Sequence, residues 1–330
     1  MARRWTADEI LNMVRAFQPA CVLTAAADLN IFSALAARPM TAQSLATKLD
    51  TDLRATTVLL DALTALRLLT KRTDKYSVPS NATRMLTEGN PDNILLGIRH
   101  QANCLRRWVQ LVQVTQTGKP PKREPSIRGP AADETAFIGA MDNFSAPAAN
   151  QIVDRLKPLK FNHLLDIGGA SGTWTIAFLH IAPKAKATLF DLPTVIPLAR
   201  NRIVQAGISD RVTFGAGDFY SDKLPAGADF AWLSAVAHQN SREQNRALFA
   251  KIYSALEKNG ILAIRDVVMD ESRTSPCGGA LFAVNMLVAT QGGGTYTFKE
   301  FRDDLTQAGF TKVKLVHRDP CMNSLIRAKK

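Results

Sequence analysis

Hydrophobic positions follow one period in the first half of the chain and another in the second. Near the N-terminus, apolar residues such as Ile10, Val14 and Phe17 recur three and four positions apart, which is the spacing of an amphipathic helix. We therefore expect helices over residues 8–37, with Pro19 interrupting the first of them. Later helical segments are expected at 91–117 and 133–156, on either side of a Pro- and Gly-rich loop at 118–130.

The second half has the pattern of strands alternating with helices. Five short apolar runs predict strands: "HLLDIG", "KATLFD", "RVTFGAG", "ADFAWLSA" and "GILAIRDVV". Helices are expected between and after them at 172–181, 195–206 and 241–257. This order predicts a parallel, doubly wound α/β sheet, which is a Rossmann-like architecture. The last two strand-like runs, "TKVKLVHR" and "MNSLIRAK", are only a few residues apart, so we expect an antiparallel hairpin at one sheet edge.

Residues 41–80 have the outline of a winged helix. Thr41 can cap one helix, Thr51 or Asp52 can cap a second, and the strand-like "YSVP" follows a polar turn. A winged helix often binds DNA through its second helix, which needs basic and amide side chains. Here the charges over 52–69 sum to zero and the other positions are largely apolar. The pattern favours packing or dimerisation over DNA binding.

We expect three regions: a helical, winged-helix-like dimerisation domain at 1–117, a loop and bridging helix at 118–156, and an α/β domain at 157–330. The net charge of +12 is spread over the chain, with +5 in residues 1–150 and +7 in residues 151–330. Neither half has a basic block, so a solvated, mildly basic surface is expected and a nucleic-acid partner is not.

Cysteine spacing and N-terminal composition are typical of a reduced, cytoplasmic protein. Cys21, Cys104, Cys277 and Cys321 are far apart and form no CxxC pair, which argues against a disulfide framework or a zinc site. Charged and polar residues interrupt what would be the apolar core of a signal peptide. No run reaches about 18 consecutive apolar residues, so we expect no membrane span. From the cysteine spacing we also expect no metal.

The segment "LLDIGGASGTW" (164–174) is a strand followed by a glycine-rich turn and a helix. Gly168, Gly169 and Gly172 allow a tight turn and a close approach of the backbone to a ligand. Asp191 ends the next strand, where an acidic side chain can accept hydrogen bonds from both hydroxyls of a ribose. This pairing fits either a dinucleotide or S-adenosylmethionine (SAM).

Two features favour SAM. The spacing is D-x-G-G-x-x-G rather than the dinucleotide pattern G-x-G-x-x-G. Asp166 would lie near the amino group of the ligand's methionine, whereas it would repel a pyrophosphate. In "GAGDFY", Asp218 can accept from an adenine amino group and Phe219 can cover the ring. Two further cofactor-binding candidates are Leu192, which follows Asp191, and Ser234, which lies at the end of the fourth predicted strand.

These motifs, in this order, resemble the class I SAM-dependent O-methyltransferases of the caffeate and hydroxyindole (acetylserotonin) type. The resemblance rests on "DIGGASG", "FDLP", "GDFY" and "AHQNS" behind a winged-helix segment, and it covers nearly the whole chain. It implies a seven-stranded SAM-binding sheet and an N-terminal domain that forms an intertwined homodimer. Ala170 and Ser171 replace the family's usual third glycine and threonine, and both are small.

His238 ends the fourth predicted strand and Asp266 ends the fifth. In an open α/β sheet these carboxyl ends border the ligand crevice. The resemblance implies that His238 is the general base and that Asp266 orients it. The usual supports are altered, since Gln239 and Asn240 follow the histidine in place of Asp-Trp, and Thr295 stands where the family has a second acidic residue. Asn240 could also donate to the substrate.

An apolar pocket is expected for the methyl acceptor. Asn285 is the strongest candidate, because an amide inside the apolar run "LFAVNMLVA" needs a polar partner. Other candidates are Trp108, Phe137, Met141 and Met286. Phe137 and Met141 are one helical turn apart and share a face.

The leading hypothesis is a homodimeric SAM-dependent O-methyltransferase that acts on a small aromatic (phenolic or polycyclic) hydroxyl compound. Two classes of alternative stay open. One is methylation of nitrogen, sulfur or carbon in a small molecule, or of RNA. The other is a SAM-binding transcriptional regulator that uses its winged helix.

Overall fold

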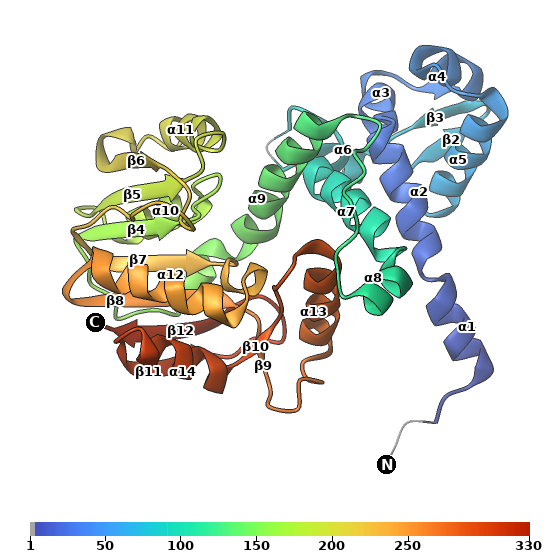
Figure 1. Cartoon of the computed structure of the whole chain (residues 1–330). Helices are drawn as coiled ribbons and strands as arrows, with labels where there is room; N and C mark the ends of the chain where they lie inside the picture. The colour runs from blue at the N-terminus through green and yellow to red at the C-terminus, as the bar shows by residue number, and fades with distance from the viewer. Residues whose placement is uncertain (1–3, 91) are drawn as a thin grey trace. The chain divides into compact units, whose positions relative to one another are not determined.

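The chain forms two compact units that are discontinuous in sequence (Figure 1). Residues 4–90 and 92–330 are described in the computed structural model. The first unit contains the chain up to Arg106 together with Glu124–Asn143, and the second contains Arg107–Arg123 together with Phe144–Lys330. Residues 107–123, which include the first part of the loop at 118–130, therefore belong with the C-terminal part of the chain.

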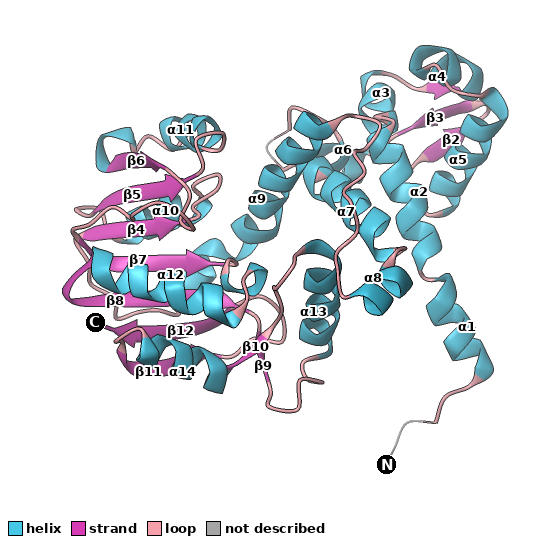
Figure 2. Cartoon of the chain, in the orientation of Figure 1, coloured by secondary structure: helices cyan, strands magenta, loops and turns pink. Residues whose placement is uncertain are grey.

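The first unit is mostly helical with one small antiparallel sheet (Figure 2). The sheet has the order β1-β3-β2, formed by β1 (Met40–Thr41), β2 (Thr70–Arg72) and β3 (Lys75–Ser77). Its helices are α1 (Ala7–Arg15), α2 (Phe17–Asp28), α3 (Ile31–Ala37), α4 (Ala42–Leu49), α5 (Leu53–Ala65), α6 (Ser80–Leu86), most of α7 (Leu95–Trp108) and the first half of α9 (Pro130–Asp154).

Local sequence signals account for several helix ends in this unit. The Thr41 side chain accepts from the backbone of Ser44 at the start of α4, and Asp52 accepts from Ala55 at the start of α5, as expected. The expected interruption at Pro19 is wrong. Pro19 lies in the first turn of α2, where its missing N–H would have had no helical partner. The chain breaks instead at Ala16.

One segment of the first unit, Ala7–Asp28, is apolar over a length that bears on the expectation of no membrane span. Within the described residues, Ala7–Asp28 is long and apolar enough, by length and composition alone, to cross a membrane. Little of it is buried, and α1 exposes Met13 and Val14 to solvent. The apolar side chains of α1 are therefore open to solvent in the single chain.

The second unit is built on a seven-stranded, mostly parallel sheet with the order β11-β12-β8-β7-β4-β5-β6, and the expected hairpin β11–β12 lies at its edge. The strands are β4 (His163–Ile167), β5 (Lys186–Asp191), β6 (Val212–Ala216), β7 (Ala228–Ser234), β8 (Leu256–Asp266), β11 (Thr311–His317) and β12 (Ser324–Lys329). A separate parallel pair joins β9 (Val268–Met269) to β10 (Tyr296–Thr297). The helices are α8 (Leu111–Thr117), the second half of α9, α10 (Thr173–Ile181), α11 (Ile196–Gln205), α12 (Arg242–Ala255), α13 (Cys277–Ala289) and α14 (Phe298–Gln307), with short 3-10 turns η1 (Ser209–Arg211) and η2 (Ala237–Gln239).

Helices cover both faces of this sheet, because alternate side chains of each central strand point to opposite faces. On β7, Phe230 and Trp232 pack in one core with α10 and α11. Ala231 and Leu233 pack in the other core with α12 and α14. The parallel strands β4, β5, β7 and β8 all end at the same edge, and the predicted donor-binding and catalytic residues lie at or just beyond it.

Candidate active site

The β4–α10 turn is closely packed from both sides. Gly168, Ala170 and Gly172 have left-handed backbone conformations, with φ of 67°, 46° and 81°. A Cβ on Gly169 would lie 2.6 Å from Cγ of Leu189 on β5, which is closer than atoms of a folded protein approach. Only glycine fits at position 169, and the turn holds the start of α10 against β5.

Asp166 lies beneath this turn and is 1% exposed. The hydroxyl of Thr175 donates to its Oδ2 over 2.7 Å. Burial raises the pKa of this carboxyl to about 7, and the negative charge of Asp191 adds to the rise. A buried carboxylate in this position attracts a cation, because a cationic ligand would replace the hydration that burial removes.

Asp191 closes β5 and is bound by the turn itself. The backbone N–H of Ala170 donates to Oδ2 and that of Leu192 donates to Oδ1, both over 2.7 Å. Each oxygen accepts one of these bonds and keeps capacity for another donor. The Leu192 side chain is largely exposed.

The segment 218–222 forms a compact loop after β6. Asp218 accepts from the N–H of Tyr220, and Asp222 accepts from the N–H of Asp218, both over 2.8 Å. Lys251 on α12 donates to the carbonyl oxygens of Phe219, Tyr220 and Asp222 over 3.0, 2.6 and 3.0 Å. Sequence reasoning missed Lys251, since nothing near it in the chain indicates that its ammonium group ties down a loop 29 to 32 residues away.

The ends of β4, β6 and β7 meet at this point. A Cβ on Gly168 would lie 3.2 Å from Cγ2 of Val236 and 3.7 Å from Cε1 of Phe219. The glycine turn therefore contacts both the 218–222 loop and the segment that leads to His238. The structure brings these three predicted parts together.

Ser234 ends β7 and accepts from a buried arginine. Nη1 of Arg265 donates to its Oγ over 3.1 Å, and Nε donates to Asn323 over 2.8 Å. The guanidinium lies over the ring of Trp174, and burial lowers the pKa of Arg265 to about 10. Arg265 was not predicted, because an arginine inside an apolar strand run gives no sign of its partners.

His238 lies in η2, just beyond β7, and is buried. Its Nδ1 is 2.8 Å from Oδ1 of Asp266, and its backbone N–H donates to Oδ2 over 3.2 Å. The N–H of Val267 also donates to Oδ1. Since the carboxylate accepts all of these bonds, Nδ1 of His238 carries the hydrogen and Nε2 keeps its lone pair.

A run of three glycines covers the backbone of His238. The N–H of Gly294 donates to the carbonyl oxygen of His238 over 2.9 Å. A Cβ on Gly293 would lie 2.5 Å from that oxygen and 2.9 Å from the carbonyl oxygen of Gln239. Thr295 follows and is buried, with its carbonyl oxygen bound by Arg273. Within the described chain, the carboxylate bound to His238 is that of Asp266.

Two acceptor-site candidates are joined in the second unit. The indole N–H of Trp108 donates to Oδ1 of Asn285 over 2.9 Å. The ring of Phe282, on the same helix as Asn285, meets the His238 ring edge-on with centroids 4.8 Å apart. Met286 is buried. Phe137 and Met141 belong to the first unit, where Phe137 packs on His100, and their role stays a prediction.

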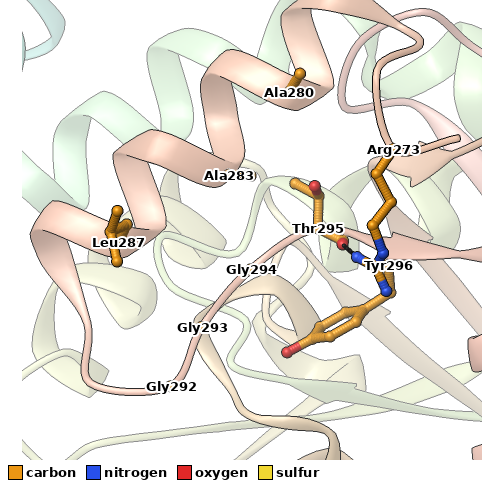
Figure 3. Close-up of a pocket in the computed structure, with 9 residues that line it drawn as sticks. All are labelled: Arg273, Ala280, Ala283, Leu287, Gly292, Gly293, Gly294, Thr295 and Tyr296. Carbon is orange, nitrogen blue, oxygen red and sulfur yellow. Dashed lines mark hydrogen bonds between the residues drawn. The ribbon is translucent and has the colours of Figure 1, made fainter. Parts of the chain in front are cut away.

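A cavity of about 360 Å³ lies along another side of α13 (Figure 3). It is lined by Arg273, Ala280, Ala283, Leu287, Gly292, Gly293, Gly294, Thr295 and Tyr296. Neither His238 nor Asn285 lines it. Among the described residues, no group of three or more His, Cys, Asp or Glu side chains could hold a metal ion.

Comparison with known proteins decides the family. An O-methyltransferase domain model matches residues 127–311, and an O-methyltransferase dimerisation domain model matches residues 11–87. This chain belongs to the O-methyltransferase family. Members of the family use SAM as the methyl donor.

Relatives cover almost the whole chain. A 3-hydroxy-5-methyl-1-naphthoate 3-O-methyltransferase of Streptomyces sahachiroi is 32% identical, over 89% of this chain and 86% of that one. A tetracenomycin polyketide synthesis 8-O-methyl transferase of Streptomyces glaucescens is also 32% identical, over 93% and 92%. The crystal structure of human N-acetylserotonin methyltransferase in complex with SAM has a TM-score of 0.83 at 24% identity, covering 100% and 99%, and it shows the same fold.

The residues of this O-methyltransferase fit SAM. Its cationic methionine part suits the buried carboxylate of Asp166, and its ribose hydroxyls suit the oxygens of Asp191, which keep accepting capacity. Gly168 and Gly172 supply the left-handed turn that keeps side chains out of the crevice.

We expect Gly169→Ala to weaken binding of S-adenosylhomocysteine (SAH) by at least about tenfold, because the new methyl group must displace Leu189 or the turn. Gly278→Ala is the matched control, since a Cβ there comes no closer than 3.6 Å to another atom. Isothermal titration calorimetry measures both. Equal SAH affinity in the two variants would contradict the packing argument.

Proposed function

We propose that this O-methyltransferase transfers a methyl group from SAM to a hydroxyl of a small aromatic compound, with His238 as the general base. The observation that carries the proposal is the His238–Asp266 pair, which lies directly beyond the strand ends that form the SAM crevice. The names of the two Streptomyces relatives support a phenolic or polycyclic acceptor.

The residues divide into two groups by their part in the reaction. Bound SAM supplies an electrophilic methyl group. Asp166, Asp191, Asp218 and the glycine turn would hold the donor, with Phe219 against the adenine. His238 takes the proton of the acceptor hydroxyl on Nε2, while its Nδ1–H stays on Asp266. The carboxylate stabilises the imidazolium that forms, and the proton later leaves to solvent.

The acceptor would lie between His238 and α13. Phe282 supplies an aromatic surface beside the imidazole, and Met286 supplies apolar contact. Trp108 occupies Oδ1 of Asn285, so the amide Nδ2 is the group that can donate to an oxygen of the acceptor. A flat aromatic ring that carries two oxygen substituents suits this lining.

The apolar face of α1 supports a homodimer through the N-terminal region. Ile10, Leu11, Met13, Val14 and Phe17 are each about half exposed or more. Most of this segment falls within the match to the dimerisation domain. A second copy of the chain would remove these side chains from water, which stabilises association.

His238→Gln should lower kcat by about 10²- to 10⁴-fold and leave SAH affinity within about twofold, because the base acts on the acceptor and not on the donor. His163→Gln, at the opposite end of β4 from the glycine turn, is the control. Hydroxynaphthoic acids and an aminonaphthol serve as acceptors. Mass spectrometry of the products separates a methyl ether from a methylamine. Unchanged turnover in His238→Gln would refute the base assignment, and a methylamine product would refute transfer to oxygen.

SAH binding should tighten as the pH rises from about 6 to about 8. The pKa of Asp166 in the folded protein is about 7, above its ordinary value, so the carboxyl is protonated at the low end of this range and ionised at the high end. The ionised form attracts the ammonium group of SAH. Calorimetry across this range tests the expectation, and Asp166→Asn should lose the pH dependence. A slope that persists in Asp166→Asn would assign the effect to another group.

Val14→Asp should shift the protein from dimer toward monomer, because it places a charge on the apolar face of α1. Val204→Asp on α11 is a matched control, since the two valines are 65% and 61% exposed. Analytical ultracentrifugation gives the association state. A wild-type monomer, or a dimer untouched by Val14→Asp, would rule out this face as the dimer contact.

A further inference from the structure

Asn240 is 0% exposed and its polar groups are bound to the protein. Its Oδ1 accepts from the hydroxyl of Tyr220 over 2.5 Å, and its Nδ2 donates to Oδ1 of Asn245 over 3.0 Å. The hydroxyl of Tyr296 donates to its carbonyl oxygen. The amide oxygen and one amide N–H therefore have protein partners, which gives Asn240 a structural role in this turn.

These bonds hold the turn that carries His238. Nδ2 of Asn245 donates to the carbonyl oxygen of Ala237 over 2.9 Å. Gly294 also donates to the carbonyl oxygen of His238, and the backbone N–H of His238 donates to Asp266. Residues 237–240 are therefore held by hydrogen bonds from several different segments. Asn240 is the member of this turn whose side chain reaches toward the donor site.

Tyr220 belongs to the loop at the other end of this contact. The loop is fixed by Lys251 and by the bonds of Asp218 and Asp222, while the Tyr220 side chain reaches out to Asn240. The Phe219 ring lies against that of Tyr220, with centroids 4.6 Å apart. The Tyr220–Asn240 hydrogen bond therefore joins the loop beside the proposed adenine site directly to the turn of His238.

We propose that the Tyr220–Asn240 hydrogen bond couples occupancy of the donor site to the placement of His238, so that Tyr220 and Asn240 are positioning residues. This inference rests on the proposed donor site and on the proposed role of His238. Because coupling is reciprocal, we expect a substitution that loosens the His238 turn to weaken donor binding through this bond.

The test is a double-mutant cycle on SAH affinity, measured by isothermal titration calorimetry on the full-length protein. Tyr220→Phe removes the bond itself, and Tyr296→Phe loosens the His238 turn from its other side. We expect Tyr220→Phe to raise the Kd by about three- to tenfold and Tyr296→Phe by about twofold to fivefold, as for single hydrogen bonds. In the Tyr220→Phe background, Tyr296→Phe should have little further effect.

Tyr253→Phe is the control. Tyr253 lies in α12, and its ring packs on Phe310 rather than on the loop or the His238 turn, so this substitution should leave the Kd unchanged. Effects of Tyr220→Phe and Tyr296→Phe that simply add would overturn the coupling, as would an unchanged Kd in Tyr220→Phe. Failure of the wild-type protein to bind SAH would instead overturn the donor site. Thermal unfolding of each variant shows whether it is folded.

A second measurement reports on His238 directly. In protein labelled with ¹³C-histidine, the His238 signal is assigned from its loss in His238→Gln. SAH should move this signal in the wild-type protein and move it by less than half as much in Tyr220→Phe. An equal shift in both proteins would contradict the proposal, whatever the acceptor of the enzyme is.

Discussion

One buried carboxylate organises the candidate active site. Asp266 ends β8 and accepts from three N–H groups: the backbone and the imidazole of His238, and the backbone of Val267. Two of these bonds come from a turn that follows a different strand, so the carboxylate joins the ends of β7 and β8. A buried anion is costly unless it is fully bonded, and the protein meets that cost with backbone donors. The orientation of the imidazole follows from the same bonds.

Glycine supports this arrangement from two directions. Gly169 lets β5 pack against the turn that precedes α10, and Gly293 lets the segment before β10 lie on the carbonyl groups of His238 and Gln239. In both places the backbone of one segment takes the space that a side chain would need. The donor crevice and the His238 turn are thus fixed by close backbone packing as well as by hydrogen bonds, which favours preorganisation.

The sequence could predict the parts of the site that depend on local pattern. Alternating apolar runs gave the order of strands and helices, and strand ends located Asp191, His238 and Asp266 because parallel strands share one edge. Capping residues such as Thr41 and Asp52 marked helix starts. The prediction at Pro19 was wrong because proline interrupts a helix only in its interior and is tolerated in the first turn. Lys251, Arg265 and the Tyr220–Asn240 contact were beyond reach, since each depends on hydrogen bonds between segments that no local pattern relates.

Among the glycines at 292–294, Gly293 is the one that the backbone of His238 requires, since a Cβ on Gly294 would meet no atom within 4 Å. Any side chain at position 293 would clash with the backbone oxygen of His238, so we expect no single substitution to be tolerated there. On α13, Phe282 packs edge-on against the His238 ring, so of the three residues proposed to face the acceptor it is the one whose substitution would disturb the histidine. Under the proposed mechanism, the acceptor site on α13 can be changed at Asn285 while the pairing of His238 with Asp266 is kept. A library for new acceptors would therefore vary this part of the helix and keep Gly293.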